Sequence, residues 1–171
     1  MRAELERLRA AAAPGPVLDL ACGSGRNALF LGGAGFRVVG LDRDRERLAA
    51  LASTAHARAL RVAAVHADLE AGHGIPLASA SCGAVLVFRY LHRPLAREIE
   101  RVLHRGGLLL YETFTIHQRD VAQHPSSPAF LLEPGELLRL FAGLEVLRAE
   151  EALVRAPTRE AVARLVARKP S

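Results

Sequence analysis

The 171-residue sequence has no tryptophan, one methionine and two cysteines, Cys22 and Cys82, which lie far apart in the chain. Two distant cysteines argue against a disulfide framework or a thiolate metal site, so a reducing cytoplasm is the expected location. An apolar run of about 18 residues is also missing, which excludes a membrane-spanning helix. The first residues, MRAELERLRAAAA, contain acidic side chains and no hydrophobic segment, so no secretory signal is expected there.

Lysine is nearly absent, since Lys169 is the single lysine among the 23 basic residues. The formal charge of +5 and the isoelectric point near 10.2 are compatible with a nucleic-acid partner. However, the arginines are scattered over every segment, and no basic stripe interleaved with aromatics is present to stack bases. A nucleic-acid substrate is therefore not favoured, although it stays open.

Half of the residues are apolar and about a quarter are charged, as is typical of a globular domain. The length suits one domain with a real core, and neither an internal repeat nor a linker divides the chain. We therefore predict a single domain over residues 1–171, which begins with a short helix within residues 1–15.

Apolar segments alternate with helical patterns along most of the chain. Strands are predicted at Val17–Leu20, Phe36–Leu41, Arg61–Ala67, Cys82–Phe88 and Leu108–Phe114, and helices at Met1–Ala13, Arg26–Ala34, Arg43–His56 and Pro94–His104. The connections are too long for hairpins, and several strands are apolar on both faces. This pattern favours βαβ units, with a parallel sheet covered by helices on both sides.

The C-terminal part follows another pattern. Residues 117–132 begin with a polar stretch, His117–Pro128, that has no periodicity. This segment is predicted to be a mobile loop over the substrate site. A helix at Glu133–Phe141 and strands at Leu144–Glu151 and Ala161–Lys169 are expected next. Because no helix separates these two strands, they are predicted to form an antiparallel hairpin at the edge of the sheet.

The first strand ends in a glycine loop, Gly23-x-Gly25-x-x-Ala28, that leads into a helix. Such a loop offers backbone amides to an anionic group, and its spacing also satisfies the fingerprint of an NAD site. A tight structural turn is the alternative. In an open parallel sheet the ligand lies at the carboxyl ends of the strands, so the side chains found there distinguish these readings.

Three carboxylates stand at or near these strand ends. Asp42 can accept both hydroxyls of a ribose, Asp68 can accept the exocyclic amine of adenine, and Asp19 would lie near a positively charged group above the loop. S-adenosylmethionine carries an ammonium and a sulfonium and has no pyrophosphate, so it suits this set better than NAD. Structural alternatives stay open: Asp42 as a helix cap, Asp68 as a turn residue, and Asp19 bonded to loop amides.

Five segments, in order, carry a family resemblance: VLDLACGSGRN, VVGLDRD, HADLE, VLVFRYLHRPL and RGGLLLYETF. Together they resemble the class I S-adenosylmethionine-dependent methyltransferases, and within them the small tellurite-resistance-type branch, which shares the G-x-G-R-N continuation. The resemblance covers about Pro16 to Leu147. It implies a Rossmann-like methyltransferase fold, an α/β doubly wound and mostly parallel seven-stranded sheet whose last strand is antiparallel. Ala21 stands where the family often has its first glycine.

The resemblance also implies the cofactor, S-adenosylmethionine, with S-adenosylhomocysteine as product. Asp19 and the loop from Ala21 to Gly25 would hold the methionine part, Asp42 the ribose, and Asp68 with the Leu69 backbone the adenine. The complete set of expected cofactor-binding residues is Asp19, Ala21, Cys22, Gly23, Gly25, Arg26, Asn27, Asp42, Arg43, Asp68, Leu69, Phe88 and Arg89.

The acceptor pocket is expected in the segments after the fourth and fifth strands. Tyr90 and His92 are the catalytic candidates: His92 as a general base or an ordinary capping histidine, and Tyr90 as a pocket or core residue. Arg89 and Arg93 could bind an anionic acceptor, and Glu112 could orient the acceptor or pair with one of these arginines. His117 and His124 lack a ligand pattern, so no metal is expected.

We therefore expect a cytoplasmic methyltransferase that acts on a small molecule, because about 15 residues precede the first strand and no further domain follows the last. A protein or nucleic-acid acceptor stays open. An NAD-binding oxidoreductase and a non-catalytic S-adenosylmethionine-binding or scaffold domain are the alternatives. The sequence leaves the acceptor atom, the use of a base and the oligomeric state undecided.

Overall fold

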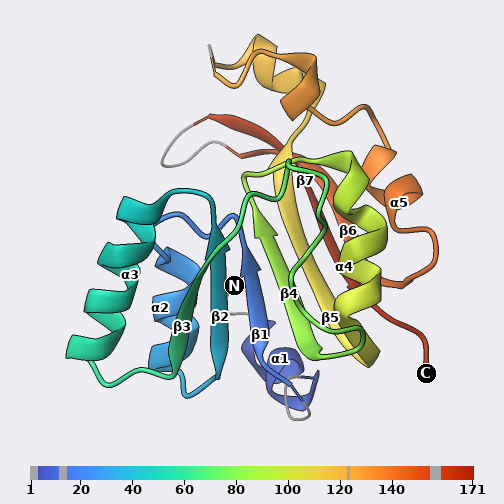
Figure 1. The fold of residues 1–171 in the computed structure, drawn as a ribbon. Helices are drawn as coiled ribbons and strands as arrows, with labels where there is room; N and C mark the ends of the chain where they lie inside the picture. Colours follow the sequence, from blue (N-terminus) through green and yellow to red (C-terminus); the bar gives the residue numbers. More distant parts are fainter. Residues whose placement is uncertain (1–3, 12–14, 123, 155–158) are drawn as a thin grey trace.

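A computed structural model describes residues 4–11, 15–122, 124–154 and 159–171 (Figure 1). Its centre is a seven-stranded sheet in the order β3-β2-β1-β4-β5-β7-β6. The strands are β1 (Val17–Leu20), β2 (Val38–Asp42), β3 (Val62–His66), β4 (Cys82–Phe88), β5 (Leu103–Phe114), β6 (Glu145–Val154) and β7 (Glu160–Arg168). The strands β1 to β5 pair in parallel, whereas β7 is antiparallel to both β5 and β6. The predicted α/β fold class and the antiparallel C-terminal hairpin are confirmed.

Five α-helices and three short 3₁₀ turns are assigned in the described residues. The helices are α1 (Leu5–Ala11), α2 (Arg26–Gly33), α3 (Arg45–Ala57), α4 (Ala96–Val102) and α5 (Glu136–Leu140), and the 3₁₀ turns are η2 (Arg93–Leu95), η3 (Ile116–Asp120) and η4 (Pro128–Phe130). The ends of the predicted N-terminal helix, residues 1–3 and 12–13, lie outside the described residues. No helix in the described part of the chain is long and apolar enough to cross a membrane.

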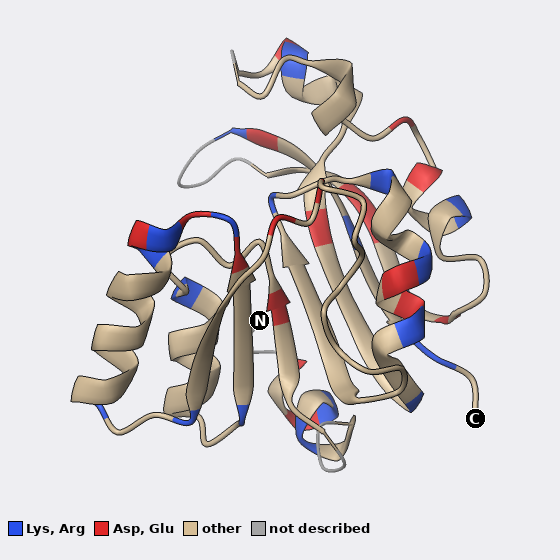
Figure 2. Ribbon diagram, in the orientation of Figure 1, with Lys and Arg blue, Asp and Glu red and all other residues tan. Residues whose placement is uncertain are grey.

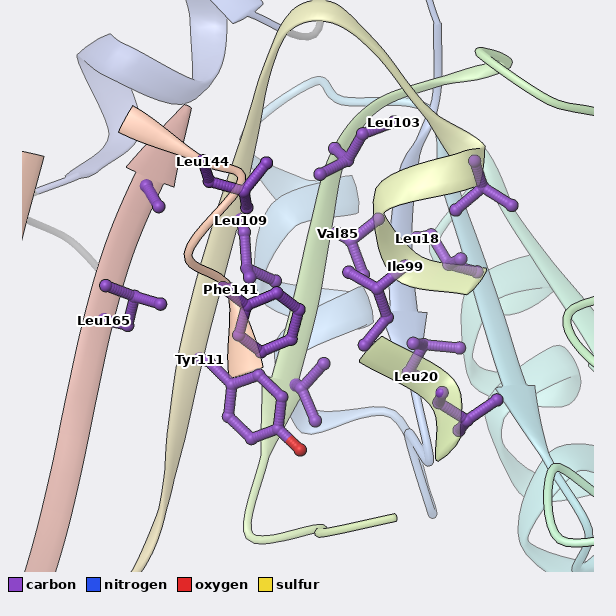
Figure 3. Close-up of a cluster of buried hydrophobic side chains, with 14 of the residues drawn as sticks. Leu18, Leu20, Val85, Ile99, Leu103, Leu109, Tyr111, Phe141, Leu144 and Leu165 are labelled. Carbon is purple, nitrogen blue, oxygen red and sulfur yellow. The ribbon is translucent and has the colours of Figure 1, made fainter. Parts of the chain in front are cut away.

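Both faces of the central strands β1 and β4 are buried, as their apolar residues predict. The strand β4 shows the reason, because Val85 and Val87 point to one face while Ala84 and Leu86 point to the other, and each is at most 1% exposed. One face packs against α4, α5 and Phe141, which directly follows α5 (Figure 3). The other face packs against α1, α2 and α3. This burial on both faces stabilises the centre of the sheet. The carboxyl ends of the parallel strands remain available to form a site.

The boundary between α4 and β5 differs from the prediction. The helix predicted at Pro94–His104 is a 3₁₀ turn followed by α4, which ends at Val102, and β5 begins at Leu103 rather than Leu108. Gly106 (φ 78°) lies inside β5, where the pairing with β4 shifts register. The glycine pair therefore forms an irregularity within the strand instead of ending the helix, as is common for bulges.

The predicted helix Glu133–Phe141 is also shorter in the structure. It begins at Glu136 because Gly135, at its N-terminal cap, has a left-handed conformation (φ 67°). The segment before it contains η3 and η4, which periodicity did not predict. The mobility expected for residues 117–132 stays a prediction.

Candidate functional site

A cavity of about 720 Å³ opens at the carboxyl ends of the parallel strands. Its lining comes from the loops that follow β1 to β4, from the end of β5 and from residues 124–130. We call the residues from the first three loops the cofactor wall: Ala21, Gly23, Asp42, Arg43, Arg47, Ala67, Asp68, Leu69 and Glu70. We call those on the other side the acceptor wall: Arg89, Tyr90, Thr113, Phe114, His124, Pro125, Ser126, Ser127 and Phe130. Leu91 also lines the cavity. Acidic and basic segments lie side by side along this edge of the sheet (Figure 2).

The glycine loop is packed closely on one side and open on the other. A Cβ at Gly25 (φ 79°) would lie 2.3 Å from Leu51 Cδ1, so this position presses the loop against α3. A Cβ at Gly23 (φ 55°) would meet only Arg47 Nη1, at 3.7 Å. Gly25 therefore serves packing, whereas Gly23 presents bare backbone to the cavity.

Asp42 ties the end of β2 to the glycine loop. Its Oδ2 accepts a hydrogen bond from the Gly23 amide at 2.7 Å, and its Oδ1 accepts one from the Asp44 amide at 2.9 Å. Each carboxylate oxygen can accept more than one bond, so the half-buried side chain retains capacity toward the cavity. This geometry fits the expected role of holding ribose hydroxyls.

The helix-cap alternative for Asp42 does not hold, because Asp44 caps α3. The Asp44 carboxylate accepts from the amides of Glu46 and Arg47 at 3.1 and 3.0 Å. Asp42 lies two residues before the cap and faces the loop instead. Asp44 therefore caps the helix, whereas Asp42 faces the cavity.

Asp68 and Leu69 line the cavity after β3, as expected for an adenine site. Asp68 Oδ1 accepts from the Glu70 amide at 2.9 Å, which makes it a turn residue as well. Leu69 is 5% exposed and forms an apolar floor. Across this loop, Arg43 pairs with Glu70 at 3.5 Å.

Asp19 is not part of the cavity lining. It is 2% exposed, and its Oδ2 accepts from the Ala28 amide in the first turn of α2 at 3.0 Å. Burial raises its pKa from 3.8 to about 7, against the lowering effects of the Ala28 bond and the charge of Arg26. The alternative of a structural acid beneath the loop describes this geometry.

Five further residues expected at the cofactor are not among the cavity-lining residues: Cys22, Gly25, Arg26, Asn27 and Phe88. Burial raises the pKa of the Cys22 thiol to about 12, so the thiol stays neutral. Phe88 follows Ala84 and Leu86 on the opposite face of β4 and lines a second cavity of about 250 Å³. Strand alternation is the physical reason, since the next residue, Arg89, is the one that reaches the main cavity.

Arg89 stands at the end of β4 with a left-handed backbone (φ 57°). Its guanidinium makes a bidentate ion pair with Glu160, with N–O distances of 2.7 and 2.6 Å. It also lies over the Phe114 ring, 5.2 Å from the centroid. The arginine therefore joins β4, β5 and β7 at the mouth of the cavity.

The two expected catalytic residues separate in the structure. Tyr90 lines the cavity, and its hydroxyl donates to Glu70 at 3.4 Å. Burial, followed by the charge of Glu70, raises the Tyr90 pKa, so the phenol is a hydrogen-bond donor and not a base. His92 does not line the cavity and makes no side-chain capping bond to η2. The histidine on the acceptor wall is His124.

The other charged candidates, Arg93 and Glu112, form ion pairs outside the main cavity. Arg93 donates to both carboxylate oxygens of Glu136, at 2.5 and 3.0 Å. Glu112 accepts from Arg164 at 2.5 Å rather than from Arg89 or Arg93. Neither of these ion pairs lines the main cavity.

Residues 124–130 lie in the segment predicted as a loop over the substrate site, although the sequence identified none of them as a binding residue. Gln118, 2% exposed, donates to the His124 carbonyl at 3.1 Å and accepts from the Ala161 amide at 2.8 Å. Arg93 donates to the carbonyls of Ala129 and Leu131 at 3.1 and 2.9 Å. These bonds come from distant parts of the chain and hold a segment without local periodicity against the cavity. Among the described residues, no group of three or more His, Cys, Asp or Glu side chains could hold a metal ion.

Comparisons with known proteins agree with this geometry. The sequence profile of the methyltransferase domain family matches residues 17–107, from β1 through the glycines of β5. No curated protein matches the sequence.

Several solved structures share the fold. TehB from Haemophilus influenzae has 22% identity and a TM-score of 0.77, with 96% of this chain and 62% of that chain covered. An S-adenosylmethionine-dependent methyltransferase from Methanosarcina mazei has 18% identity and a TM-score of 0.75, with 96% and 97% covered. Geranyl diphosphate C-methyltransferase from Streptomyces coelicolor A3(2), solved with Mg²⁺, geranyl diphosphate and S-adenosylhomocysteine, has 16% identity and a TM-score of 0.72, with 98% and 77% covered. At these identities the likeness shows the fold, and the chain spans less than two thirds of TehB.

Proposed function

The chain belongs to the methyltransferase domain family and is an S-adenosylmethionine-dependent methyltransferase, and on this premise we propose that it methylates a small molecule bound at the acceptor wall. The observation that carries the proposal is the division of one cavity of about 720 Å³ into two chemically different sides. This volume lies within the range of about 300–1,000 Å³ that is typical of small-molecule sites. We propose that the cofactor occupies the part of the cavity beside the cofactor wall and that the acceptor occupies the rest.

The residues of the cofactor wall fit S-adenosylmethionine. Gly23 leaves room where a Cβ would project toward the cavity, and Asp42 and Asp68 present carboxylate oxygens to hydroxyl and amine donors. Leu69 supplies the apolar contact for a base. We propose that Asp42 holds the ribose hydroxyls and that Asp68 and Leu69 hold the adenine.

The same geometry does not favour NAD. A pyrophosphate needs free amides in the glycine loop, yet the Gly23 amide is donated to Asp42 at 2.7 Å. That carboxylate would also repel a phosphate placed over the loop. The loop therefore suits an amino acid joined to adenosine.

The bound cofactor supplies an already activated methyl group, so the chain's contribution is mainly to position the acceptor and to exclude water. The Tyr90 hydroxyl keeps its proton and donates a hydrogen bond to Glu70 at 3.4 Å, so its oxygen can accept a hydrogen bond from a hydroxyl or amine of the acceptor. If the acceptor must lose a proton, His124 is the imidazole placed on the acceptor wall, in contrast to His92.

Incubation of a cell extract with purified protein and S-adenosylmethionine labelled in its methyl group tests the proposal. Label in the low-molecular-weight fraction, dependent on the protein and accompanied by S-adenosylhomocysteine, supports a small acceptor. Label that accumulates in protein or RNA would overturn this part of the proposal. An Asp42→Ala protein provides the matched control, because it lacks the carboxylate proposed for the cofactor.

A further inference from the structure

The arginines that line the cavity are all engaged with carboxylates. Arg43 pairs with Glu70 at 3.5 Å, and Arg47 pairs with Asp44 at 3.1 Å. Arg89 pairs with Glu160 through two bonds of 2.7 and 2.6 Å, as described above. An anionic acceptor in this cavity would therefore compete with a carboxylate for each of the arginines that are described in the lining.

The pair of Arg89 with Glu160 is the one that matters for the acceptor. It has the parallel two-bond geometry in which guanidinium–carboxylate pairs are strongest. The Glu160 side chain is 17% exposed, so an anion that bound Arg89 would have to displace a largely desolvated carboxylate that already makes two hydrogen bonds to it. The left-handed backbone of Arg89, held by its amide bond to the Glu112 carbonyl at 2.8 Å, directs the side chain into this pair. The arrangement disfavours exchange of Glu160 for an acceptor carboxylate or phosphate.

The cavity is lined by three carboxylates, Asp42, Asp68 and Glu70, and by three arginines. The arginines pair with Glu70, Asp44 and Glu160, whereas the hydrogen bonds described for Asp42 and Asp68 come from backbone amides. No described ion pair therefore offsets the charges of Asp42 and Asp68, which attract a cationic cofactor and repel an anionic acceptor at short range.

Apart from Arg89 and His124, the acceptor wall consists of uncharged residues and is rich in rings. Phe114, Pro125 and Phe130 provide apolar surface, and hydroxyl groups come from Tyr90, Thr113, Ser126 and Ser127. Phe130 lines the cavity and is 50% exposed, so its ring is accessible to an acceptor. A flat apolar body with a polar substituent would satisfy both kinds of group.

We infer that the acceptor wall selects an uncharged small molecule with an aromatic-sized apolar body and rejects anions of the same shape. The inference rests on the proposed function, since it names the class of acceptor for that site. It assigns Glu160 the part of a specificity-determining residue that acts through Arg89.

Two probes of equal shape test it: benzamide, which is neutral, and benzoate, which is anionic. Binding of each is measured by ligand-observed NMR titration to the full chain saturated with S-adenosylhomocysteine. Benzamide is expected to bind at least about tenfold more tightly than benzoate. Glu160→Gln, which releases Arg89, is expected to raise benzoate affinity about tenfold while benzamide binding changes little.

Glu145→Gln is the matched control. It removes a carboxylate of the same hairpin, one that pairs with Arg168 at 3.8 Å and does not line the main cavity, so both probes should bind as to the wild type. Benzoate binding as tight as benzamide in the wild type would overturn the inference, as would failure of both probes to bind. If Glu160→Gln does not fold, the wild-type comparison still decides.

The outcome is separable from that of the proposed function. If label from the methyl donor enters protein or RNA, the small-molecule proposal itself fails. If label enters small molecules while benzoate is preferred over benzamide, only the charge selectivity fails.

Discussion

Replacement of Asp42 by alanine tests the cofactor wall most sharply, because this carboxylate holds the glycine loop and faces the cavity at once. The substitution removes the acceptors of the Gly23 and Asp44 amides, at 2.7 and 2.9 Å, together with those proposed for the ribose. A hydrogen bond to a charged group contributes about 1.5–3 kcal/mol, and the half-buried position lets water replace part of it. We expect a loss of about 1–3 kcal/mol in binding of S-adenosylhomocysteine, or about 5- to 150-fold in Kd.

Isothermal titration calorimetry measures this loss of affinity. Two further variants separate the effect of the carboxylate charge and the effect of the neighbouring helix cap. Asp42→Asn keeps one oxygen acceptor without the charge, so its affinity should lie between those of the wild type and Asp42→Ala. Asp44→Ala removes the α3 cap and should lower the unfolding free energy by about 1 kcal/mol while the Kd changes less than about twofold. An unchanged Kd for Asp42→Ala would refute the assignment of the ribose to this residue.

Three more outcomes follow from the described contacts. Gly25→Ala should lower the unfolding free energy by about 1–3 kcal/mol, because its Cβ would collide with Leu51 and the residue has a positive φ. Gly33→Ala is the control and should be neutral or stabilising, since a Cβ there meets nothing within 4 Å. Urea unfolding measures both variants, and equal effects would contradict this. Because burial raises the pKa of Asp19 from 3.8 to about 7, the folded protein keeps a proton that the unfolded chain releases between these pH values, so this group's contribution to stability falls as the pH rises through that window. Asp19→Asn lacks this loss, so its unfolding free energy should gain on the wild type from pH 4 to 7, and a pH-independent difference would count against the buried acid. Arg93→Gln should speed amide hydrogen exchange in residues 126–131, since it removes bonds to two carbonyls and to Glu136, and wild-type protection there would contradict the anchoring role.

The fold was largely predictable because its strands are apolar on both faces and alternate with helices. The strands β1 and β4 have the predicted boundaries, Val17–Leu20 and Cys82–Phe88, and β7 and β6 form the predicted hairpin. The start of β5 was not predictable in the same way. Gly106 and Gly107 read locally as a helix stop, whereas pairing with β4 carries the strand through them.

The site was predictable where it depends on strand ends and not where it depends on tertiary contacts. Asp42, Asp68 and Arg89 reach the cavity because each lies at, or within two residues of, the carboxyl end of a parallel strand. His92 does not, since its backbone leads into a 3₁₀ turn, and Phe88 points to the other face of the sheet. The position of residues 124–130 depends on hydrogen bonds from Arg93 and from Gln118, which is itself bonded to Ala161, and no local pattern reveals these long-range contacts.

We propose that the cavity at the ends of β1 to β3 holds S-adenosylmethionine. Calorimetric titration of the wild-type protein with S-adenosylhomocysteine and, separately, with NAD tests it directly. We expect one S-adenosylhomocysteine to bind per chain, with an affinity that Asp42→Ala lowers, and no heat from NAD. Binding of NAD without binding of S-adenosylhomocysteine would contradict it.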